Sequence, residues 1–263
     1  MIDKFKIQSR KVHFSGFNGG QLAASLDFPR EVAPAQYAII SHCFTCTKQT
    51  LTTARLGRGL AQAGYGVLRF DFTGLGDSEG VFADTHFRSM IKDIECAADW
   101  LATHYQPANI LIGHSMGGTA SLAAACDGGA SLAQVEKVIT LASPAIPGHV
   151  LHHFGPAMAK LQHGETAEIK VAGQAYVVKP AFVEDVNSYD MVAQMRDCHI
   201  PVMAVRAGDD ELIGPQDAQQ LLGYGNTASR LCQIDGADHL FSNRNHAEQL
   251  LAEILNWIKN TRK

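Results

Sequence analysis

Short apolar runs alternate with segments of helical periodicity along most of this sequence. Apolar runs of strand length occupy residues 37–41, 65–70, 109–112, 135–141, 201–206 and 230–234. Apolar side chains recur at helical spacing in residues 51–62, 87–104 and 247–258. Uniformly apolar strands separated by helices predict an α/β fold with a parallel sheet that is buried on both sides. Right-handed crossovers then place helices on each face of that sheet.

The beginning of the chain follows a different pattern. Residues 12–14 and 21–28 are strand-like, and Asn18, Gly19 and Gly20 between them suit a tight turn. We therefore expect an antiparallel pair of strands at the start of an otherwise parallel sheet.

Residues 146–200 interrupt the alternation of strands and helices. This interval is too long for a simple connection. It contains a predicted helix at about residues 149–162 and a predicted hairpin that turns at Gly173. We expect one domain over residues 1–263, in which this interval forms a cap-like insertion over the functional site.

Composition and charge narrow the functional classes. The 263 residues are 46% apolar and 18% charged with a formal net charge of −4, which is typical of a globular protein. Because there is no basic run, we do not expect nucleic acid as a partner. No segment has the apolar length of a signal peptide or a membrane span, so we expect a cytoplasmic protein without a membrane partner.

The six cysteines are scattered along the chain, and without an export signal we expect reduced thiols. Cys43 and Cys46 form a C-x-x-C pair. This pair follows a strand and has no second pair of ligands, so we interpret it as loop structure rather than as a redox or metal site. His149, His152 and His153 lack a paired-ligand pattern, and we expect them on the surface or in the wall of a pocket.

A serine stands between a predicted strand and a predicted helix. Residues 113–117 read Gly-His-Ser-Met-Gly, after the apolar run 109–112 and before the small-residue stretch 119–126. A sharp turn between a strand and a helix exposes a serine hydroxyl at its apex. The N-terminus of the following helix favours the negative charge that develops when the hydroxyl reacts. The pattern predicts Ser115 as a nucleophile.

A second G-x-S-x-G string surrounds Ser78, but its context differs. The preceding strand ends near Phe72, and no helical pattern begins until about His86. Asp77 and Glu79 flank this serine with negative charge, which opposes the formation of an alkoxide. We interpret Ser78 as part of a loop.

A serine nucleophile needs a base and an acid that orients the base. In a strand–turn–helix architecture they follow the serine in the order acid, then histidine. An acidic run follows the strand at residues 201–206. Asp210 stands four residues beyond the strand, with Leu212 and Ile213 behind it, and this resembles the usual position of the acid in hydrolases of this architecture. Asp209 and Glu211 are the alternatives.

The base is expected in the loop between the last strand and the last helix. His239 lies in that glycine-containing loop, and His246, at the start of the closing helix, is its nearest rival. His114 is adjacent to the nucleophile in sequence. We expect its side chain to point away from Ser115 and to pack or hydrogen-bond locally.

Hydrolysis through a serine also needs donors for an oxyanion. The turn itself supplies the backbone N–H of Met116. We expect the second donor in the loop after the strand at residues 37–41, where the N–H of Phe44 is preferred and that of Cys43 is the alternative.

These motifs together resemble the α/β-hydrolase superfamily over essentially the whole chain. The matching segments are residues 42–44, residues 71–80, the turn at Ser115, the Asp210 loop and residues 236–239. The resemblance implies a mostly parallel sheet of the eight-stranded type and a Ser-His-Asp triad. Cys43 departs from the superfamily, which usually has glycine at this position.

A narrower resemblance rests on two segments. Residues 41–46 read Ser-His-Cys-Phe-Thr-Cys, and residues 71–76 read Asp-Phe-Thr-Gly-Leu-Gly. They are similar to the hydrolase half of bacterial proteins that fuse an α/β-hydrolase to an OsmC-type peroxidase domain. This sequence contains no counterpart of the second domain, so the resemblance implies no peroxidase activity.

We therefore expect a serine hydrolase that needs no cofactor and no metal. The preferred hypothesis is a carboxylesterase that acts on small ester or thioester substrates through Ser115, Asp210 and His239. A peptidase or an acyltransferase on the same fold is an alternative, because a triad does not specify the leaving group. A non-enzymatic binding protein is a third hypothesis. Chelators and thiol reductants should leave the activity unchanged.

Overall fold

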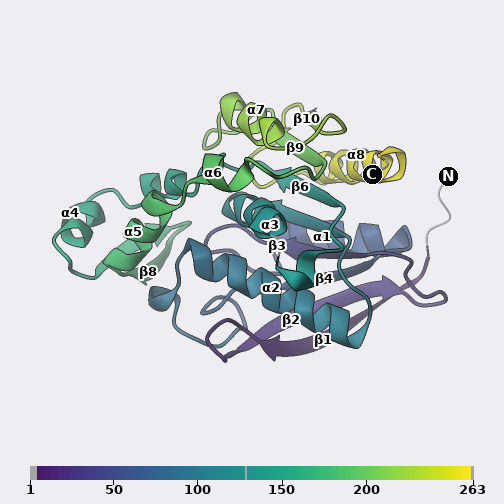
Figure 1. Cartoon of the computed structure of the whole chain (residues 1–263), viewed down its shortest axis with the longest axis horizontal. Coiled ribbons are helices and arrows are strands. Elements are labelled where there is room, and N and C mark those ends of the chain that lie inside the picture. Colours follow the sequence, from purple (N-terminus) through teal and green to yellow (C-terminus); the bar gives the residue numbers. More distant parts are fainter. Residues whose placement is uncertain (1–4, 128, 262–263) are drawn as a thin grey trace.

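The computed structural model describes residues 5–127 and 129–261. Its centre is an eight-stranded sheet with the order β1-β2-β4-β3-β5-β6-β9-β10 (Figure 1). The strands are β1 (Ile7–Ser15), β2 (Gln21–Pro29), β3 (Tyr37–Ser41), β4 (Gly66–Phe70), β5 (Ile110–His114), β6 (Lys137–Leu141), β9 (Val202–Ala207) and β10 (Arg230–Ile234). The β1–β2 and β2–β4 pairs are antiparallel and the other neighbouring pairs are parallel. This confirms the predicted sheet with its antiparallel opening.

Helices cover both faces of the sheet, as predicted (Figure 1). One face carries α1 and α8, and the other carries α2, α3 and α7. Their bounds are α1 (Leu51–Gln62), α2 (Phe87–His104), α3 (Met116–Asp127), α7 (Pro215–Gly223) and α8 (Arg244–Asn260). In β3, Ile39 packs under α2 and α3, whereas Ala38 and Ile40 pack under α1 and α8. Burial on both faces explains why these strands are apolar throughout.

Between β6 and β9 the chain leaves the sheet and forms a group of short elements. They are the 3-10 helix η3 (Pro147–His153), α4 (Ala157–Gln162), β7 (Ala167–Val171), β8 (Gln174–Val178), α5 (Pro180–Ser188) and α6 (Met191–Met195). In Figure 1, α4, α5 and β8 project beyond one end of the central sheet. Two further 3-10 turns, η1 (Phe82–Asp84) and η2 (Ala130–Leu132), lie outside this group.

The prediction of one continuous helix at residues 149–162 is wrong. The chain forms η3 and then α4, with Gly155 and Pro156 between them. Gly155 has a positive φ of 40°, which a right-handed helix does not accommodate, and Pro156 lacks the N–H that would continue the hydrogen bonds. The predicted hairpin is confirmed, because β7 and β8 pair antiparallel around a turn at Ala172 and Gly173.

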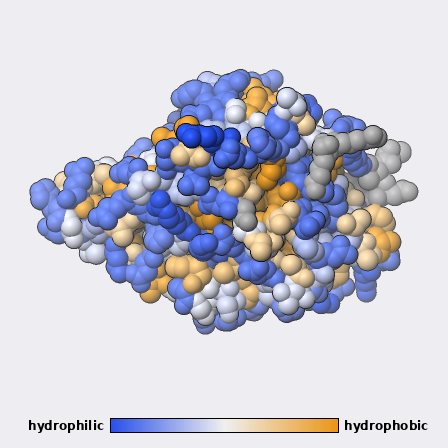
Figure 2. Space-filling model, viewed as in Figure 1, coloured by the Kyte–Doolittle hydropathy of each residue, from blue (hydrophilic) through white to orange (hydrophobic). Residues whose placement is uncertain are grey.

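Hydrophilic residues cover most of the face shown in Figure 2. Large apolar side chains that are exposed, such as Leu51 and Val192, lie on different elements. Scattered apolar residues are normal on a protein surface. None of the helices in the described residues is long and apolar enough to cross a membrane.

The prediction that the cysteines are reduced thiols is wrong for four of them. Disulfides join Cys43 to Cys46 and Cys126 to Cys198, whereas Cys96 and Cys232 are free. Cys126 and Cys198 are 72 positions apart in sequence, but the fold brings their Cα atoms to 5.2 Å. Sequence spacing alone does not reveal such a pair. The expectation of reduced thiols followed from the predicted cytoplasmic location, and that location stays a prediction.

Candidate active site

Ser115 lies at the junction of β5 and α3 in a conformation that few side chains adopt. Its φ is 52°, in the left-handed region that is unfavourable for residues other than glycine. Its backbone N–H donates to Leu141 O at 2.8 Å, so the neighbouring strand β6 holds the turn. Every residue from Ile110 to Ala125 is buried except Ser115, which is partly exposed. The turn therefore presents one hydroxyl from an otherwise closed layer.

Two glycines allow this turn to be sharp. A Cβ at Gly113 would collide with the carbonyl oxygen of Gly117, and a Cβ at Gly117 would collide with the carbonyl oxygen of His42. The turn at Ser115 is thus in direct backbone contact with the loop that follows β3. This contact brings the loop of Phe44 against the start of α3.

Asp210 follows β9, and its side chain is only 1% exposed. Its Oδ2 accepts a hydrogen bond from His239 Nδ1 at 2.8 Å, and its Oδ1 accepts from the N–H groups of Leu212 and Ile213 at 2.9 and 3.0 Å. Burial by itself raises the pKa of Asp210, but these donors, led by His239, outweigh burial and lower that pKa below its ordinary value. The carboxylate is therefore charged at neutral pH.

The alternative candidates for the acid and the base do not take part in this hydrogen bond. The side chains of Asp209 and Glu211 are exposed. His246 lies in the first turn of α8, beside Gly236. Within the described residues, none of the three is hydrogen-bonded to His239. The structure therefore joins Asp210, and not its neighbours, to the histidine of the last loop.

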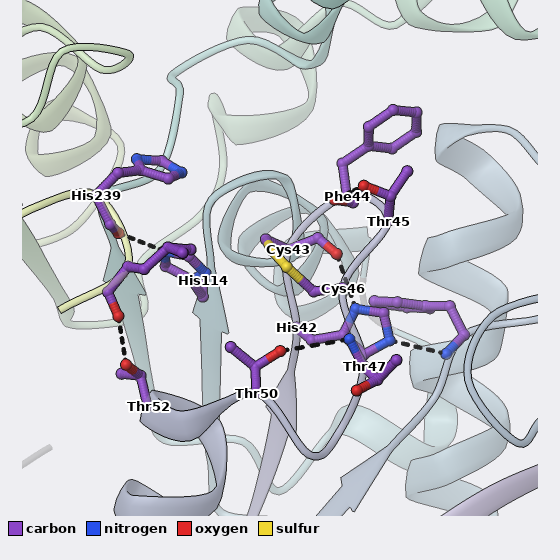
Figure 3. The surroundings of a disulfide bond; sticks show 12 residues. His42, Cys43, Phe44, Thr45, Cys46, Thr47, Thr50, Thr52, His114 and His239 are labelled. Atoms are coloured by element: carbon purple, nitrogen blue, oxygen red, sulfur yellow. Dashed lines mark hydrogen bonds between the residues drawn. A yellow bond between two sulfur atoms is a disulfide. The ribbon is translucent and has the colours of Figure 1, made fainter. Parts of the chain in front are cut away.

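His114 has a longer-range contact than the sequence predicts. Its Nε2 lies 2.7 Å from the backbone carbonyl oxygen of His239, which is 125 positions away (Figure 3). Burial, followed by the neighbouring His239, lowers the pKa of His114 to about 3. The ring is therefore neutral, and its Nε2–H donates to that carbonyl. Because His114 precedes Ser115, this bond holds the loop of His239 against the turn that carries the serine.

The pKa of His114 leads to a prediction about acid stability. Its pKa is near 6.5 in the unfolded chain and about 3 in the folded protein, so the unfolded state binds more protons between these values. Stability should therefore fall as pH decreases below 6.5, with a contribution of about 3 kcal/mol by pH 4. Glutamine does not titrate and keeps an N–H donor. His114→Gln should lose less of its unfolding free energy between pH 7 and pH 4 than the parent protein.

Urea titrations of both proteins at the two pH values measure this difference. Other titrating groups are common to both proteins and cancel in the comparison. An equal loss of unfolding free energy in the variant and the parent would contradict a buried, neutral His114.

Ser115 and His239 are not hydrogen-bonded to each other in the described part of the chain. Nδ1 of His239 faces Asp210, so Nε2 is the ring atom left to accept a proton. The His239 side chain is 15% exposed, and Ser115 is also partly open to solvent. Contacts of this kind are often long in a free enzyme and tighten when substrate binds.

The backbone N–H groups of Met116 and Phe44 have no acceptor among the described residues. Met116 is the first residue of α3, where N–H groups have no partner within the helix. In the Phe44 loop, His42 Nδ1 donates to Cys43 O at 2.8 Å, and His42 Nε2 accepts the N–H of Phe72 at 3.2 Å (Figure 3). Burial lowers the pKa of His42, so the ring is neutral while it orients this loop.

Ser78 is occupied by structural hydrogen bonds. Its Oγ donates to Asp71 O at 2.6 Å and accepts the N–H of Ala23 at 2.9 Å. The interpretation of this serine as part of a loop is confirmed.

Aromatic side chains from the segment between β6 and β9 pack on the loop after β3. The ring of Phe44 is 5.5 Å from that of Phe182 and 6.4 Å from that of Phe154, and Phe82 of η1, outside this segment, also lies 5.5 Å from it. The Tyr176 hydroxyl of β8 donates to the carbonyl oxygen of residue 45 at 3.2 Å. These contacts were not visible in the sequence, because no periodic pattern relates such distant aromatic residues.

Three histidines connect the same segment to the Asp210 loop. Neighbouring rings of His149, His152 and His153 lie 4.9 and 3.8 Å apart. His149 Nε2 is 3.0 Å from Leu212 O, and the N–H of the same residue donates to Asp210. Burial, followed by the neighbouring histidines, lowers the pKa of His153 to about 4. In the part of the chain that the structure describes, no three His, Cys, Asp or Glu residues are arranged to hold a metal ion.

Comparisons with known proteins agree with this architecture. A family model described as serine aminopeptidase, S33, matches residues 39–180. The esterase domain of a Rhodothermus marinus protein is 32% identical, with a TM-score of 0.76, and the match covers 96% of this chain and 98% of that chain. No curated protein matches the sequence.

Two more distant structures show the fold alone. Est1E from Butyrivibrio proteoclasticus, solved with ferulic acid bound, is 20% identical with a TM-score of 0.74 and coverage of 95% of this chain and 100% of that chain. XC6422 from Xanthomonas campestris, described as a serine hydrolase without a lid, is 19% identical with a TM-score of 0.65 and coverage of 99% of each chain.

Proposed function

Because this chain belongs to the serine aminopeptidase S33 family of the α/β-hydrolase superfamily, we propose that it is a serine esterase with the triad Ser115, His239 and Asp210. The observation that carries the proposal is the 2.8 Å hydrogen bond between His239 Nδ1 and the buried Asp210 carboxylate. Two further observations support it. Ser115 lies in a sharp turn with a positive φ, and the adjacent His114 holds the loop of His239 against that turn. A nucleophile, a base and an orienting acid are the parts that acyl transfer requires.

The proposed reaction proceeds through an acyl-enzyme. Ser115 Oγ attacks the ester carbonyl carbon while His239 Nε2 takes the hydroxyl proton. Asp210 stabilises the resulting imidazolium, and His239 then returns the proton to the leaving alcohol or thiol. A water molecule, deprotonated by the same nitrogen, hydrolyses the acyl-enzyme and releases the acid.

The oxyanion of each tetrahedral intermediate is bound by the N–H groups of Met116 and Phe44 in this proposal. Neither N–H has an acceptor in the described residues, and the contact of Gly117 with His42 joins the two segments that carry them. The loss of one such donor typically lowers kcat about 10²–10³-fold.

We also propose that the chain is one domain over residues 1–263 and that the segment at about 146–200 caps the site. The packing of Phe154 and Phe182 on Phe44 supports this assignment. An apolar or aromatic acyl group would contact this aromatic layer. Ferulic acid bound to Est1E makes phenolic acid esters reasonable members of a substrate panel.

We propose esters or thioesters, rather than aminoacyl compounds, as the substrates. An aminopeptidase needs a free carboxylate to receive the α-ammonium group of its substrate. Here Asp185 of the cap is engaged by the N–H and the guanidinium of Arg88, and the histidine cluster contacts the Asp210 loop through His149. Imidazoles attract an ammonium group less than carboxylates do, so the peptidase remains the alternative hypothesis.

A substrate panel tests this choice. We would measure kcat/KM for nitrophenyl and feruloyl esters, acyl-CoA thioesters and aminoacyl amides, with and without an acceptor alcohol. The proposal predicts that esters or thioesters exceed aminoacyl amides by at least about 100-fold, because the aromatic layer of the cap suits an apolar acyl group better than a charged ammonium group. Preference for aminoacyl amides would indicate a peptidase, and efficient transfer to the alcohol would indicate an acyltransferase.

A further inference from the structure

The disulfide between Cys43 and Cys46 closes the turn that carries Phe44 (Figure 3). The two Cα atoms are 5.2 Å apart, and the N–H of Cys46 donates to Cys43 O at 3.1 Å. Phe44 and Thr45 are the two central residues of this turn. The disulfide therefore spans the peptide whose N–H is assigned to the oxyanion.

The turn has a conformation that its own sequence does not favour. Thr45 has a φ of 63°. A turn with positive φ at its third residue normally has glycine or asparagine there, and a β-branched residue is a marked exception. The Thr45 hydroxyl donates to Phe44 O at 2.6 Å, and Tyr176 donates to Thr45 O at 3.2 Å, which offsets part of the disadvantage. The disulfide between the ends of the turn supplies the rest of the restraint that keeps Thr45 at this φ.

The same turn determines the direction of the Phe44 N–H. The carbonyl of Cys43 accepts from both His42 Nδ1 and the N–H of Cys46. In a trans peptide the carbonyl and the following N–H point in opposite directions, so the N–H of Phe44 points away from the His42 ring. If the ends of the turn separate, the Cys46 donor is lost, and the single hydrogen bond from His42 restrains the peptide less than the two bonds together.

The rest of the loop has anchors that do not depend on the disulfide. Both the backbone N–H and the side-chain Nζ of Lys48 donate to the buried carboxylate of Asp71 at 2.5 Å. Arg69 donates to Lys48 O at 2.6 Å. Opening the disulfide should therefore change residues 43–46 and leave the following helix α1 in place.

We propose that Cys43–Cys46 is a thiol–disulfide site at which a dithiol reductant reversibly lowers the hydrolytic activity by releasing the Phe44 donor. The inference rests on the proposed function. It replaces the expectation from sequence that thiol reductants leave the activity unchanged, because that expectation assumed free thiols at Cys43 and Cys46. A thiolate of the reductant attacks Cys46 Sγ, which is more accessible because Cys46 is partly exposed and Cys43 is 7% exposed. Cys43 leaves as a thiolate, and the second thiol of the reductant displaces Cys46. Two electrons and two protons pass to the protein, and the reductant becomes a disulfide.

The test compares Ser115-dependent esterase activity before reduction, after dithiothreitol and after reoxidation with oxidised glutathione. Mass spectrometry of alkylated samples reports which cysteines are reduced. We expect reduction of Cys43–Cys46 to lower kcat about 10- to 100-fold with little change in KM, because an oxyanion donor acts mainly in the transition state. Reoxidation should restore kcat, and the melting temperature should change little where only Cys43–Cys46 is reduced.

Three variants separate this effect from general destabilisation. Cys43→Ser/Cys46→Ser should have the low kcat permanently and no further response to dithiothreitol. Adding Thr45→Gly to that variant should recover part of the kcat, because glycine adopts a positive φ without the disulfide. Cys126→Ala/Cys198→Ala should still respond to reductant as the parent does.

Undiminished kcat in protein with reduced Cys43 and Cys46 would overturn the proposal, as would a loss that follows Cys126–Cys198 instead. Either result would leave the proposed esterase function standing, because the oxidised enzyme would still hydrolyse esters through Ser115. Oxidised enzyme without Ser115-dependent activity would instead overturn the proposed function, and this inference with it.

Discussion

Replacing Ser115 with alanine is expected to lower kcat for ester hydrolysis about 10⁴- to 10⁶-fold, to near the background rate. No other group in the proposed mechanism can form the acyl-enzyme. The hydroxyl makes no hydrogen bond in the described residues, and alanine tolerates the φ of 52° about as poorly as serine does. The melting temperature should therefore remain close to that of the parent. Initial rates with a nitrophenyl ester and a thermal melt measure both quantities.

Ser78 provides the matched control, because it lies in the second G-x-S-x-G string. Ser78→Ala removes hydrogen bonds to Asp71 and Ala23, so we expect lower stability with turnover largely retained at a temperature where the variant is folded. A variant pair in which Ser78→Ala is inactive and Ser115→Ala is active would show that the nucleophile is assigned to the wrong serine.

Asp210→Asn is expected to lower kcat about 10⁴-fold. Asparagine can still accept the N–H groups of Leu212 and Ile213 through its carbonyl oxygen. Its amide nitrogen, however, cannot accept the Nδ1–H of His239. The imidazole would then favour the tautomer with its proton on Nε2, which cannot act as the base. Steady-state kinetics with a good ester substrate measure the loss.

The neighbouring acids provide the comparison for this variant. Asp209→Asn and Glu211→Gln should each retain kcat within a few-fold, because both side chains are exposed and neither is bonded to His239. If Glu211→Gln were the severe variant and Asp210→Asn were mild, the orienting acid would have to be moved by one residue.

The sheet could be predicted from sequence because its strands are short and apolar on both faces. Residues 37–41 and 230–234 were expected with the bounds they have in the structure. The segment between β6 and β9 was harder, because its elements are too short for a periodic signal. A long apolar pattern at residues 149–162 concealed the interruption at Gly155 and Pro156.

The candidate site could be predicted in part from the sequence, for a related reason. Ser115, Asp210 and His239 lie in the turn and loops that follow β5, β9 and β10, where the spacing from a strand end carries information. His114 and Cys43 act through partners that the fold determines. His114 reaches a carbonyl 125 positions away, and sequence-local reasoning predicted only a local contact. For Cys43, expectations about the compartment obscured a partner three residues away.

The most direct test of the account is covalent labelling with a fluorophosphonate, followed by peptide mapping of the modified protein. The probe reacts with a serine that is activated by a base and an oxyanion site, so it reports the central claim without knowledge of the natural substrate. We predict a single adduct on Ser115, which is lost in Ser115→Ala and strongly slowed in Asp210→Asn. Absence of labelling in the folded, oxidised protein, or an adduct on Ser78 or another serine, would contradict the proposed triad.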